Sequence, residues 1–401
     1  MLVEYKKYVM AKLKYIRFSS YKKFEETTEI EIKPLTVLIG KNSSGKSSIS
    51  KLFPMFEKAM SGTSAAPFLF ENEGVSLGTA FSDIAHNGNN IGLSFGLGYE
   101  NGLDINIDFI SKVGNQDYWI KKYVLKYNGT QTVLEKENAQ GSYIDKDSLK
   151  EYVSQDFRGF INFKLFEDKN VGSVDSYFLH TDYIGPFRAF PKRAYSQRSP
   201  CLLNKIGIDG TWAYDNLNIS NELLSCVSDW YAKTFNCDLV LKQLTNGVFS
   251  VNIRKTDSAH EINIADEGQG MSQVLPIVTR CCMSDDKDTL IVVEQPELHL
   301  HPAAHEAIAD LLADTAKVNN HRYVIETHSK NLLLEIRSIV ANKNYSLTKD
   351  DVVVYYIHDD EECNAILDRI DIDENGNMSD WPEEIFNESF ELIKKIRRNA
   401  N

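Results

Sequence analysis

Residues 40–48 have the sequence GKNSSGKSS, which follows the apolar run LTVLI at 35–39 and precedes apolar residues at helical spacing. Residues 40–47 fit the pattern G-x-x-x-x-G-K-[ST] in the strand–loop–helix setting that the pattern requires. Gly40 and Gly45 let the backbone curl so that successive N–H groups point at phosphate oxygens. The stretch therefore predicts an α/β fold with a phosphate-binding loop, rather than a plain glycine- and serine-rich turn.

The side chains of this loop suit a nucleoside triphosphate. Lys46 is long enough to reach the β- and γ-phosphates, and the Ser47 hydroxyl is placed to hold Mg²⁺. The N-terminus of the following helix adds positive potential at the phosphates. The predicted nucleotide-contacting residues of the loop are Gly40, Asn42, Ser43, Ser44, Gly45, Lys46, Ser47 and Ser48.

Length and charge limit the classes of protein that the chain can belong to. Its 401 residues, 42 % of them apolar, suffice for two or three domains or for one large domain with an insertion. Lysine and arginine total 44 against 57 aspartate and glutamate, so the net charge is −13. That balance argues against a protein that coats nucleic acid, and it leaves a local basic groove as an alternative.

The cysteines and the N-terminal sequence indicate the cellular compartment that we expect for the protein. Six cysteines occur, and only Cys281 and Cys282 are close together, so we predict neither a zinc ribbon nor a disulfide framework. Free thiols suit a reducing cytosol. The N-terminus lacks an apolar core of signal-peptide length, and no run approaches the roughly 18 apolar residues of a membrane span. The sequence predicts a soluble, cytoplasmic protein.

Between the motifs, local patterns predict the main elements. Residues 90–135 alternate apolar and polar and contain an Asn128-Gly129 turn signal, which predicts a β-meander. Residues 136–175 are polar and poorly periodic, so we expect an exposed or lid-like segment. A helix is predicted over 221–234. After Trp381-Pro382, apolar residues at helical spacing predict a closing amphipathic helix.

Two later apolar runs end in polar residues. Residues 289–302 have the sequence TLIVVEQPELHLHP, and residues 321–329 have the sequence HRYVIETHS. Both runs are typical of buried parallel strands. Carboxylates at the carboxyl end of the first strand, within residues 289–302, suit a Mg²⁺ site or a general base beside a phosphate loop. The second strand ends in Glu326, Thr327 and His328.

Two further loops are weaker signals. Residues 265–278, ADEGQGMSQVLPIV, predict a tight glycine loop that opens a helix near Ser272, which suits an anion site or a simple turn. Residues 185–191, GPFRAFP, are predicted to be a loop because prolines interrupt regular structure. Arg188 in that loop either contacts phosphate or braces the turn.

Taken together, these motifs carry a resemblance. The phosphate loop, DEGQGMSQVLP at 266–276, EQPELHLHP at 294–302 and ETHS at 326–329 resemble stand-alone ABC-type ATPase heads of the RecF/SMC/OLD (overcoming lysogenisation defect) superfamily. The chain is most similar to the bacterial "AAA family" ATPases of anti-phage systems, without a Toprim nuclease. The resemblance implies a P-loop NTPase with a mixed and parallel sheet plus a β-rich and helical insertion lobe. The domain division that we expect is 1–85, 86–260 and 261–401.

The resemblance also implies roles for single residues. Lys46 and Ser47 would hold the γ-phosphate and Mg²⁺, and Glu294 would act on Mg²⁺ through water. His328 resembles the switch histidine that contacts the γ-phosphate. The signature-like loop would cap the γ-phosphate of ATP bound to the opposite subunit, through Gly270, Ser272 and Gln273. The implied assembly is a head-to-tail dimer around two ATP molecules, beside a separate effector such as a nuclease or toxin.

One departure from the family pattern affects the expected chemistry. The usual catalytic glutamate is replaced by Gln295, and a glutamine cannot take a proton from water. Either Glu297 does so, or hydrolysis is slow and ATP serves mainly to join the dimer. The sequence therefore predicts an ATPase that regulates an effector. The alternatives are a RecF-like DNA-repair ATPase and a nucleotide-binding subunit without turnover.

Overall fold

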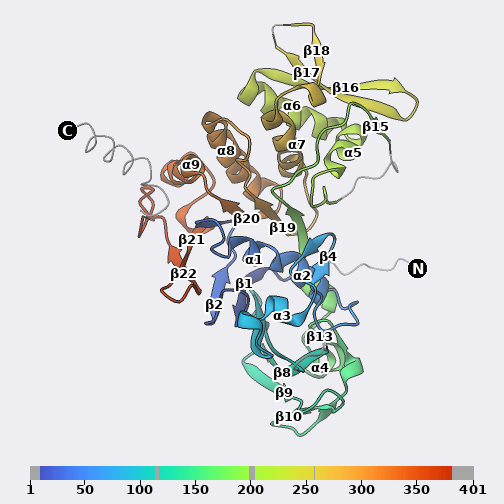
Figure 1. Cartoon of the computed structure of the whole chain (residues 1–401), viewed down its shortest axis with the longest axis vertical. Helices are drawn as coiled ribbons and strands as arrows, with labels where there is room; N and C mark the ends of the chain where they lie inside the picture. The colour runs from blue at the N-terminus through green and yellow to red at the C-terminus, as the bar shows by residue number, and fades with distance from the viewer. Residues whose placement is uncertain (1–9, 113–116, 198–203, 257, 382–401) are drawn as a thin grey trace, which may run out of the picture.

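The computed structural model describes residues 10–112, 117–197, 204–256 and 258–381, and a six-stranded sheet lies at its centre (Figure 1). The strand order is β14-β19-β20-β3-β21-β22. All neighbours are parallel except β21 and β22. The bounds are β3 Leu35–Gly40, β14 His180–Ile184, β19 Thr289–Glu294, β20 His321–Thr327, β21 Val352–Asp359 and β22 Ala365–Ile370. This sheet confirms the predicted α/β fold.

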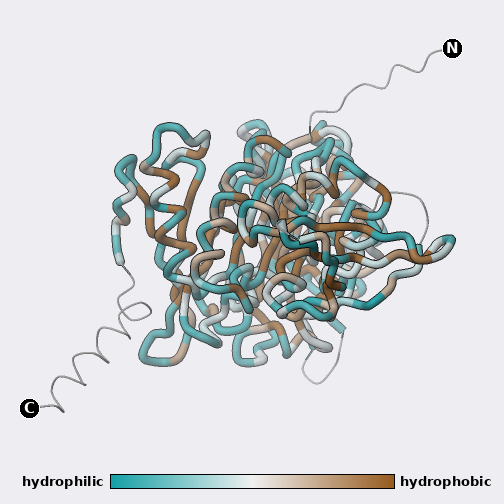
Figure 2. Tube along the Cα trace, turned by 90° about the horizontal axis from the view of Figure 1, so that it is seen from above, coloured by the Kyte–Doolittle hydropathy of each residue, from teal (hydrophilic) through white to brown (hydrophobic). Residues whose placement is uncertain are grey.

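The central strands are apolar because both of their faces are covered. Leu290 and Val292 of β19 join a core with α2 (Leu52–Met60) and a second sheet. Ile291 and Val293 join a core with α8 (Pro302–Val318) and α9 (Lys330–Ala341). Side chains alternate between the faces of a strand, so an unbroken apolar run is what a sheet with two cores requires. Figure 2 shows hydrophobic residues gathered along the interior segments, with hydrophilic residues in the outer loops.

The strand register brings three motifs to one edge of this sheet. Glu294 at the end of β19 lies opposite Glu326 near the end of β20. Glu326 in turn lies opposite Leu38 of β3, just before the phosphate loop. Because parallel strands end at the same edge, the loop and both carboxylates meet there, as in other α/β proteins.

An antiparallel sheet forms the lower part of Figure 1. Its order is β11-β10-β9-β8-β7-β6-β1-β2, so the predicted β-meander continues a sheet that begins with the N-terminal strands. Side chains of β7 alternate strictly between buried and partly exposed, as expected for a sheet with one covered face. The bounds are β1 Leu13–Ser19, β2 Thr28–Glu31, β6 Ile91–Tyr99, β7 Asp104–Ser111, β8 Tyr118–Tyr127, β9 Thr130–Glu135, β10 Tyr143–Asp145 and β11 Glu151–Tyr152.

A helical lobe with a small sheet forms the upper part of Figure 1. Its α6 matches the helix predicted over 221–234, and its α7 is the helix predicted after the glycine loop. The strands β15, β17 and β16 are neighbours, and β18 pairs with β17. The bounds are β15 Tyr195–Ser196, α5 Trp212–Ile219, α6 Asn221–Phe235, β16 Cys237–Thr245, β17 Val248–Lys255, β18 Glu261–Asn263 and α7 Gln269–Cys282.

The remaining elements connect these parts. The helix predicted after the phosphate loop is divided into α1 and α2, and α2 ends at Met60 with Ser61 as its C-cap. None of the described helices is long and apolar enough to span a bilayer. The bounds are α1 Lys46–Ser50, α2 Leu52–Met60, β4 Glu71–Asn72, β5 Val75–Ser76, α3 Phe81–Ile84, β12 Phe157–Arg158, β13 Ile161–Asn162, α4 Phe163–Asp168, α8 Pro302–Val318 and α9 Lys330–Ala341.

Two expectations from the sequence were wrong. Residues 136–175 are not a simple exposed segment, because they bury several aromatic side chains, including Tyr143, Tyr152 and Phe160. The structure also pairs Cys226 of α6 with Cys282 of α7 in a disulfide, although the spacing of the cysteines gave no sign of one.

The closing helix predicted after Trp381 lies outside the described residues. The division at residues 85 and 260 stays a prediction.

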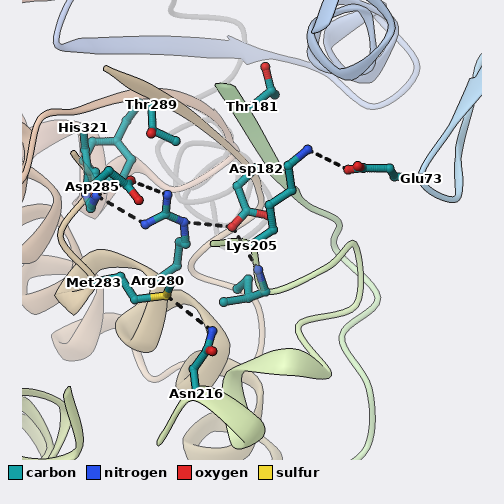
Figure 3. Close-up of polar contacts among 12 residues, drawn as sticks. Glu73, Thr181, Asp182, Lys205, Asn216, Arg280, Met283, Asp285, Thr289 and His321 are labelled. Atoms are coloured by element: carbon teal, nitrogen blue, oxygen red, sulfur yellow. Dashed lines mark hydrogen bonds and ion pairs between the residues drawn. The ribbon is translucent and has the colours of Figure 1, made fainter. Parts of the chain in front are cut away.

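A buried ion-pair cluster attaches α7 to the central sheet (Figure 3). Arg280 of α7 has no exposed surface, and its guanidinium donates to Asp182 of β14 at 2.8 Å and to Asp285 at 2.6 Å. His321 at the start of β20 lies 3.0 Å from Asp285. Burial alone would raise the pKa of Asp285, but its hydrogen bonds from His321 and Arg280 hold the pKa at about 2. The helix that carries the signature-like loop is therefore fixed to the sheet by charged contacts.

Candidate active site

The phosphate loop runs from the end of β3 into α1. Gly45 has φ 112°, and a Cβ atom there would lie 3.0 Å from the Phe24 ring. A Cβ atom at Gly40 would lie 2.3 Å from the carbonyl oxygen of Ile357. Both positions therefore require glycine, one for backbone conformation and close packing and the other for the approach of β21. The loop has the curled form that the sequence predicts.

Lys46 lies at the centre of the loop. It is 3 % exposed, and its Nζ donates to the carbonyl oxygens of Gly40 at 2.9 Å and Lys41 at 2.6 Å. Burial lowers the pKa of Lys46, while the carboxylates of Glu326 and Glu294 act in the opposite direction. The ammonium group thus faces acidic residues contributed by two other strands.

Ser47 contacts the acidic end of β20. Its Oγ lies 2.9 Å from both carboxylate oxygens of Glu326. Burial, together with the nearby Glu294, raises the pKa of Glu326 to about 7. Burial also raises the pKa of Glu294, although the Tyr183 hydroxyl donates a hydrogen bond to it. Two carboxyl groups with raised pKa values and a hydroxyl therefore lie together beside the loop.

These oxygen atoms fit Mg²⁺. The ion prefers hard oxygen ligands, and at phosphate sites it takes one or two carboxylates together with phosphate oxygens. Ser47, Glu294 and Glu326 supply such a set. Among the described residues, no three or more His, Cys, Asp or Glu side chains form a metal cluster by themselves. The arrangement suits an ion that is shared with a nucleotide rather than one held by the protein alone.

The turn after β19 places the other predicted catalytic residues. Gln295 has φ 47°, and its backbone N–H donates to the carbonyl oxygen of Glu326 at 2.7 Å. Glu297 accepts a hydrogen bond from the backbone N–H of His328 at 2.9 Å, and its buried Oε2 has no hydrogen-bond partner among the described residues. Burial, with Lys46 nearby, lowers the pKa of His328 to about 4, so its imidazole is neutral at physiological pH.

A cavity of about 260 Å³ joins these groups. The structure thus brings the phosphate loop together with Gln295 and His328, as predicted. It adds two residues to which the sequence assigned no role, Lys23 and Glu326. The sequence could have indicated Glu326, because it lies near the end of a buried strand. No sequence pattern marks Lys23. The lining residues are Lys23, Asn42, Ser43, Gly45, Lys46, Ser47, Ser48, Gln295, Glu326 and His328.

Arg188 does not line the cavity, and it supports the turn after β19 instead. It is 4 % exposed, and its Nη2 donates to the carbonyl oxygens of Glu294 at 2.7 Å and Gln295 at 3.0 Å. Burial lowers its pKa to about 10. Of the two roles that the sequence leaves open for Arg188, the contacts agree with bracing a turn.

The signature-like residues lie elsewhere in the same chain. Gly270, Ser272 and Gln273 are in the first turns of α7, and none of them lines the cavity. The hydroxyl of Ser272 donates to the carbonyl oxygen of Gln269 at 3.2 Å. A Cβ atom at Gly270 would lie 2.7 Å from the carbonyl oxygen of His299, so this loop packs closely on the turn after β19.

Comparisons with known proteins agree with this geometry. A family model described as "AAA domain, putative AbiEii toxin, Type IV TA system" matches residues 35–335. A second, described as "Protein of unknown function (DUF3696)", matches residues 347–396. No curated protein matches the chain.

A solved structure with a TM-score above 0.5 shows the same fold at low sequence identity. An SMC head bound to the C-winged helix domain of ScpA has a TM-score of 0.54 at 13 % identity, over 90 % of this chain and 97 % of that chain. An SMC head domain from Thermotoga maritima has a TM-score of 0.45 at 11 % identity, over 90 % of this chain and 100 % of that chain. With a phosphate loop of complete pattern and a family model that matches residues 35–335, the chain belongs to the family described as "AAA domain, putative AbiEii toxin, Type IV TA system".

Proposed function

We propose that this protein binds ATP with Mg²⁺ in the cavity at the carboxyl edge of the central sheet and hydrolyses it slowly. The observation that carries the proposal is the contact of Ser47 with Glu326 beside the buried Lys46. Lys46 and the loop N–H groups would bind the β- and γ-phosphates. The ion would be held by Ser47 and Glu326, with Glu294 close by, and it would offset charge on the phosphates.

We expect hydrolysis to be slow because of the chemistry of the groups in the cavity and beside it. Gln295 can orient a water molecule but cannot accept its proton. The neutral imidazole of His328 can accept a hydrogen bond or donate one to a phosphate oxygen. Glu297 has a carboxylate oxygen without a hydrogen-bond partner in the described part of the chain, and it is the alternative general base. With the glutamine in place, we expect turnover well below the roughly 1–100 s⁻¹ typical of kinases.

We further propose that ATP joins two copies of the chain. Gly270, Ser272 and Gln273 do not line the cavity of their own chain, and in a head-to-tail dimer they would cap the γ-phosphate in the other copy. Such a dimer would scaffold or restrain a separate effector protein, in keeping with the toxin-related description of the matching family. Defence against phage is the role that this arrangement suits best.

The test begins with Lys46→Ala. This change removes the ammonium group that binds the phosphates, so we expect loss of ATP binding in isothermal titration calorimetry and loss of turnover. Lys58→Ala is a matched control that should leave binding unchanged, because Lys58 is a partly exposed lysine in the last turn of α2 and does not line the cavity. Full ATP affinity in Lys46→Ala, or rapid turnover by the wild-type protein without a partner, would contradict the proposal.

A further inference from the structure

The loop 185–191 displays two aromatic side chains to solvent. Phe187 is 89 % exposed and Phe190 is 75 % exposed, which are very high values for large apolar residues. Exposed apolar groups that lie close together mark interaction sites more often than isolated ones do. These two flank Arg188, whose own side chain is almost completely buried.

The loop is held in place from several directions. The backbone N–H of Gly185 donates to the carbonyl oxygen of Ile208 at 2.8 Å, and that of Ala189 donates to Asp209 at 2.9 Å. The side chain of Gln273 donates to the carbonyl oxygen of Ala189 at 3.4 Å. Prolines at both ends further restrict the backbone. Both rings are therefore presented on a fixed loop, which lowers the entropy cost of binding a partner.

The position of the loop indicates which partner would contact the two exposed rings. On one side Arg188 holds the carbonyl oxygen of Gln295, which lines the phosphate cavity. On the other side Gln273 of the signature-like loop holds Ala189. The loop thus connects the two surfaces that an ATP-sandwich dimer brings together, one from each subunit.

We propose that Phe187 and Phe190 form an apolar contact with a second copy of this chain in the ATP-bound dimer. The inference rests on the proposed function, because it requires that ATP joins two copies. In a two-fold dimer the same patch is used on both subunits, so four aromatic rings would be buried. Buried aromatic anchors at the centre of an interface contribute a large part of its affinity.

The test compares dimer formation by the wild-type protein and by the double variant Phe187→Ser/Phe190→Ser. Sedimentation velocity with Mg²⁺ and a non-hydrolysable ATP analogue gives the dimer Kd, and calorimetry gives the affinity of the monomer for the analogue. We expect the double variant to weaken dimerisation by at least about 100-fold. Its melting temperature and its analogue affinity at monomer concentrations should stay within error of the wild type.

Matched controls use similarly exposed apolar residues on other elements, Leu149 between β10 and β11 and Val318 at the end of α8. Leu149 and Val318 are each 77 % exposed, so Leu149→Ser and Val318→Ser should leave the dimer Kd unchanged. A double variant with the wild-type dimer Kd overturns the inference and leaves the proposed function intact. An equal loss in the controls overturns it as well. A wild-type protein that binds the analogue but never dimerises shows instead that the proposed dimer is wrong.

Discussion

Gln295 lines the phosphate cavity, and the family resemblance implies a catalytic glutamate at this position. We expect Gln295→Glu to raise kcat by at least about 10-fold, because a positioned general base contributes about 10²–10⁴-fold. Phosphate release at saturating ATP measures the change. Glu297→Gln in the same background separates the two candidate bases. If Glu297→Gln abolishes turnover while Gln295→Glu leaves it unchanged, Glu297 is the base.

We expect Glu326 to make the proposed Mg²⁺ binding sensitive to pH. Burial and the neighbouring Glu294 raise its pKa to about 7, so near neutral pH a proton competes with Mg²⁺ for the carboxylate. As the pH falls from 8 to 6, the group gains its proton, and the affinity for Mg²⁺ in the presence of ATP should fall by about tenfold. Calorimetric titration of Mg²⁺ at several pH values measures this dependence.

The control for this experiment is Glu326→Gln, which carries no titrating proton. It should bind Mg²⁺ more weakly than the wild type at pH 8, and its affinity should depend much less on pH. An unchanged pH dependence in Glu326→Gln would assign the titration to another group, of which the adjacent Glu294 is the first candidate.

At the scale of elements, Arg280 joins α7 to the central sheet through Asp182 and Asp285 (Figure 3). Arg280→Met would leave the buried carboxylate of Asp182 without its guanidinium partner, and Asp285 with only His321 beside it. Removing one partner of a buried ion pair costs about 3–5 kcal/mol, so chemical denaturation should show a loss of this size. Arg280→Met/Asp182→Asn/Asp285→Asn should recover part of it, because the uncompensated charges are gone.

The exposed pair of Arg193 and Asp266 is the matched control. Their side chains are 75 % and 41 % exposed, so Arg193→Met should change stability by less than about 1 kcal/mol. A loss of under about 1 kcal/mol in Arg280→Met as well would show that the buried cluster contributes little, contrary to its geometry.

The elements that the sequence predicts best are those with strong local patterns. The apolar run before Gln295 predicts β19, and helical spacing predicts α6, because each pattern lies within a few residues. The burial of Tyr143 could not be predicted locally, since its hydroxyl donates to the carbonyl oxygen of Ile120 in another strand. The pairing of Cys226 with Cys282 likewise spans 56 residues and depends on how α6 packs on α7.

In the candidate site, residues that are contiguous in the sequence were predictable, whereas contacts between distant segments were not. The phosphate loop is contiguous, so one motif predicts most of its residues. The contact of Ser47 with Glu326 joins residues 279 positions apart, and only the register of β3 with β20 brings them together. Arg188 reaches the site from a third segment, and no spacing rule connects it to Glu294.

At the scale of the whole molecule, the charge of −13 bears on the choice of partner. Sequence-independent binding to DNA comes from lysine and arginine side chains that neutralise phosphates, and it weakens steeply as salt is added. An acidic chain is repelled by DNA unless a local basic groove offsets the net charge. The signature-like loop and the exposed pair Phe187 and Phe190 instead favour a contact between two copies of the chain.

We therefore expect that duplex DNA neither stimulates ATP hydrolysis nor binds the protein with the ATP analogue present. Phosphate release with and without DNA, measured at about 50 mM and about 200 mM salt, provides the test, and fluorescence anisotropy of labelled DNA measures binding directly. Lys46→Ala serves as the control for nucleotide dependence. Stimulation at the lower salt concentration that disappears at the higher one would reveal a basic groove and favour a RecF-like ATPase, because only phosphate contacts have that salt dependence.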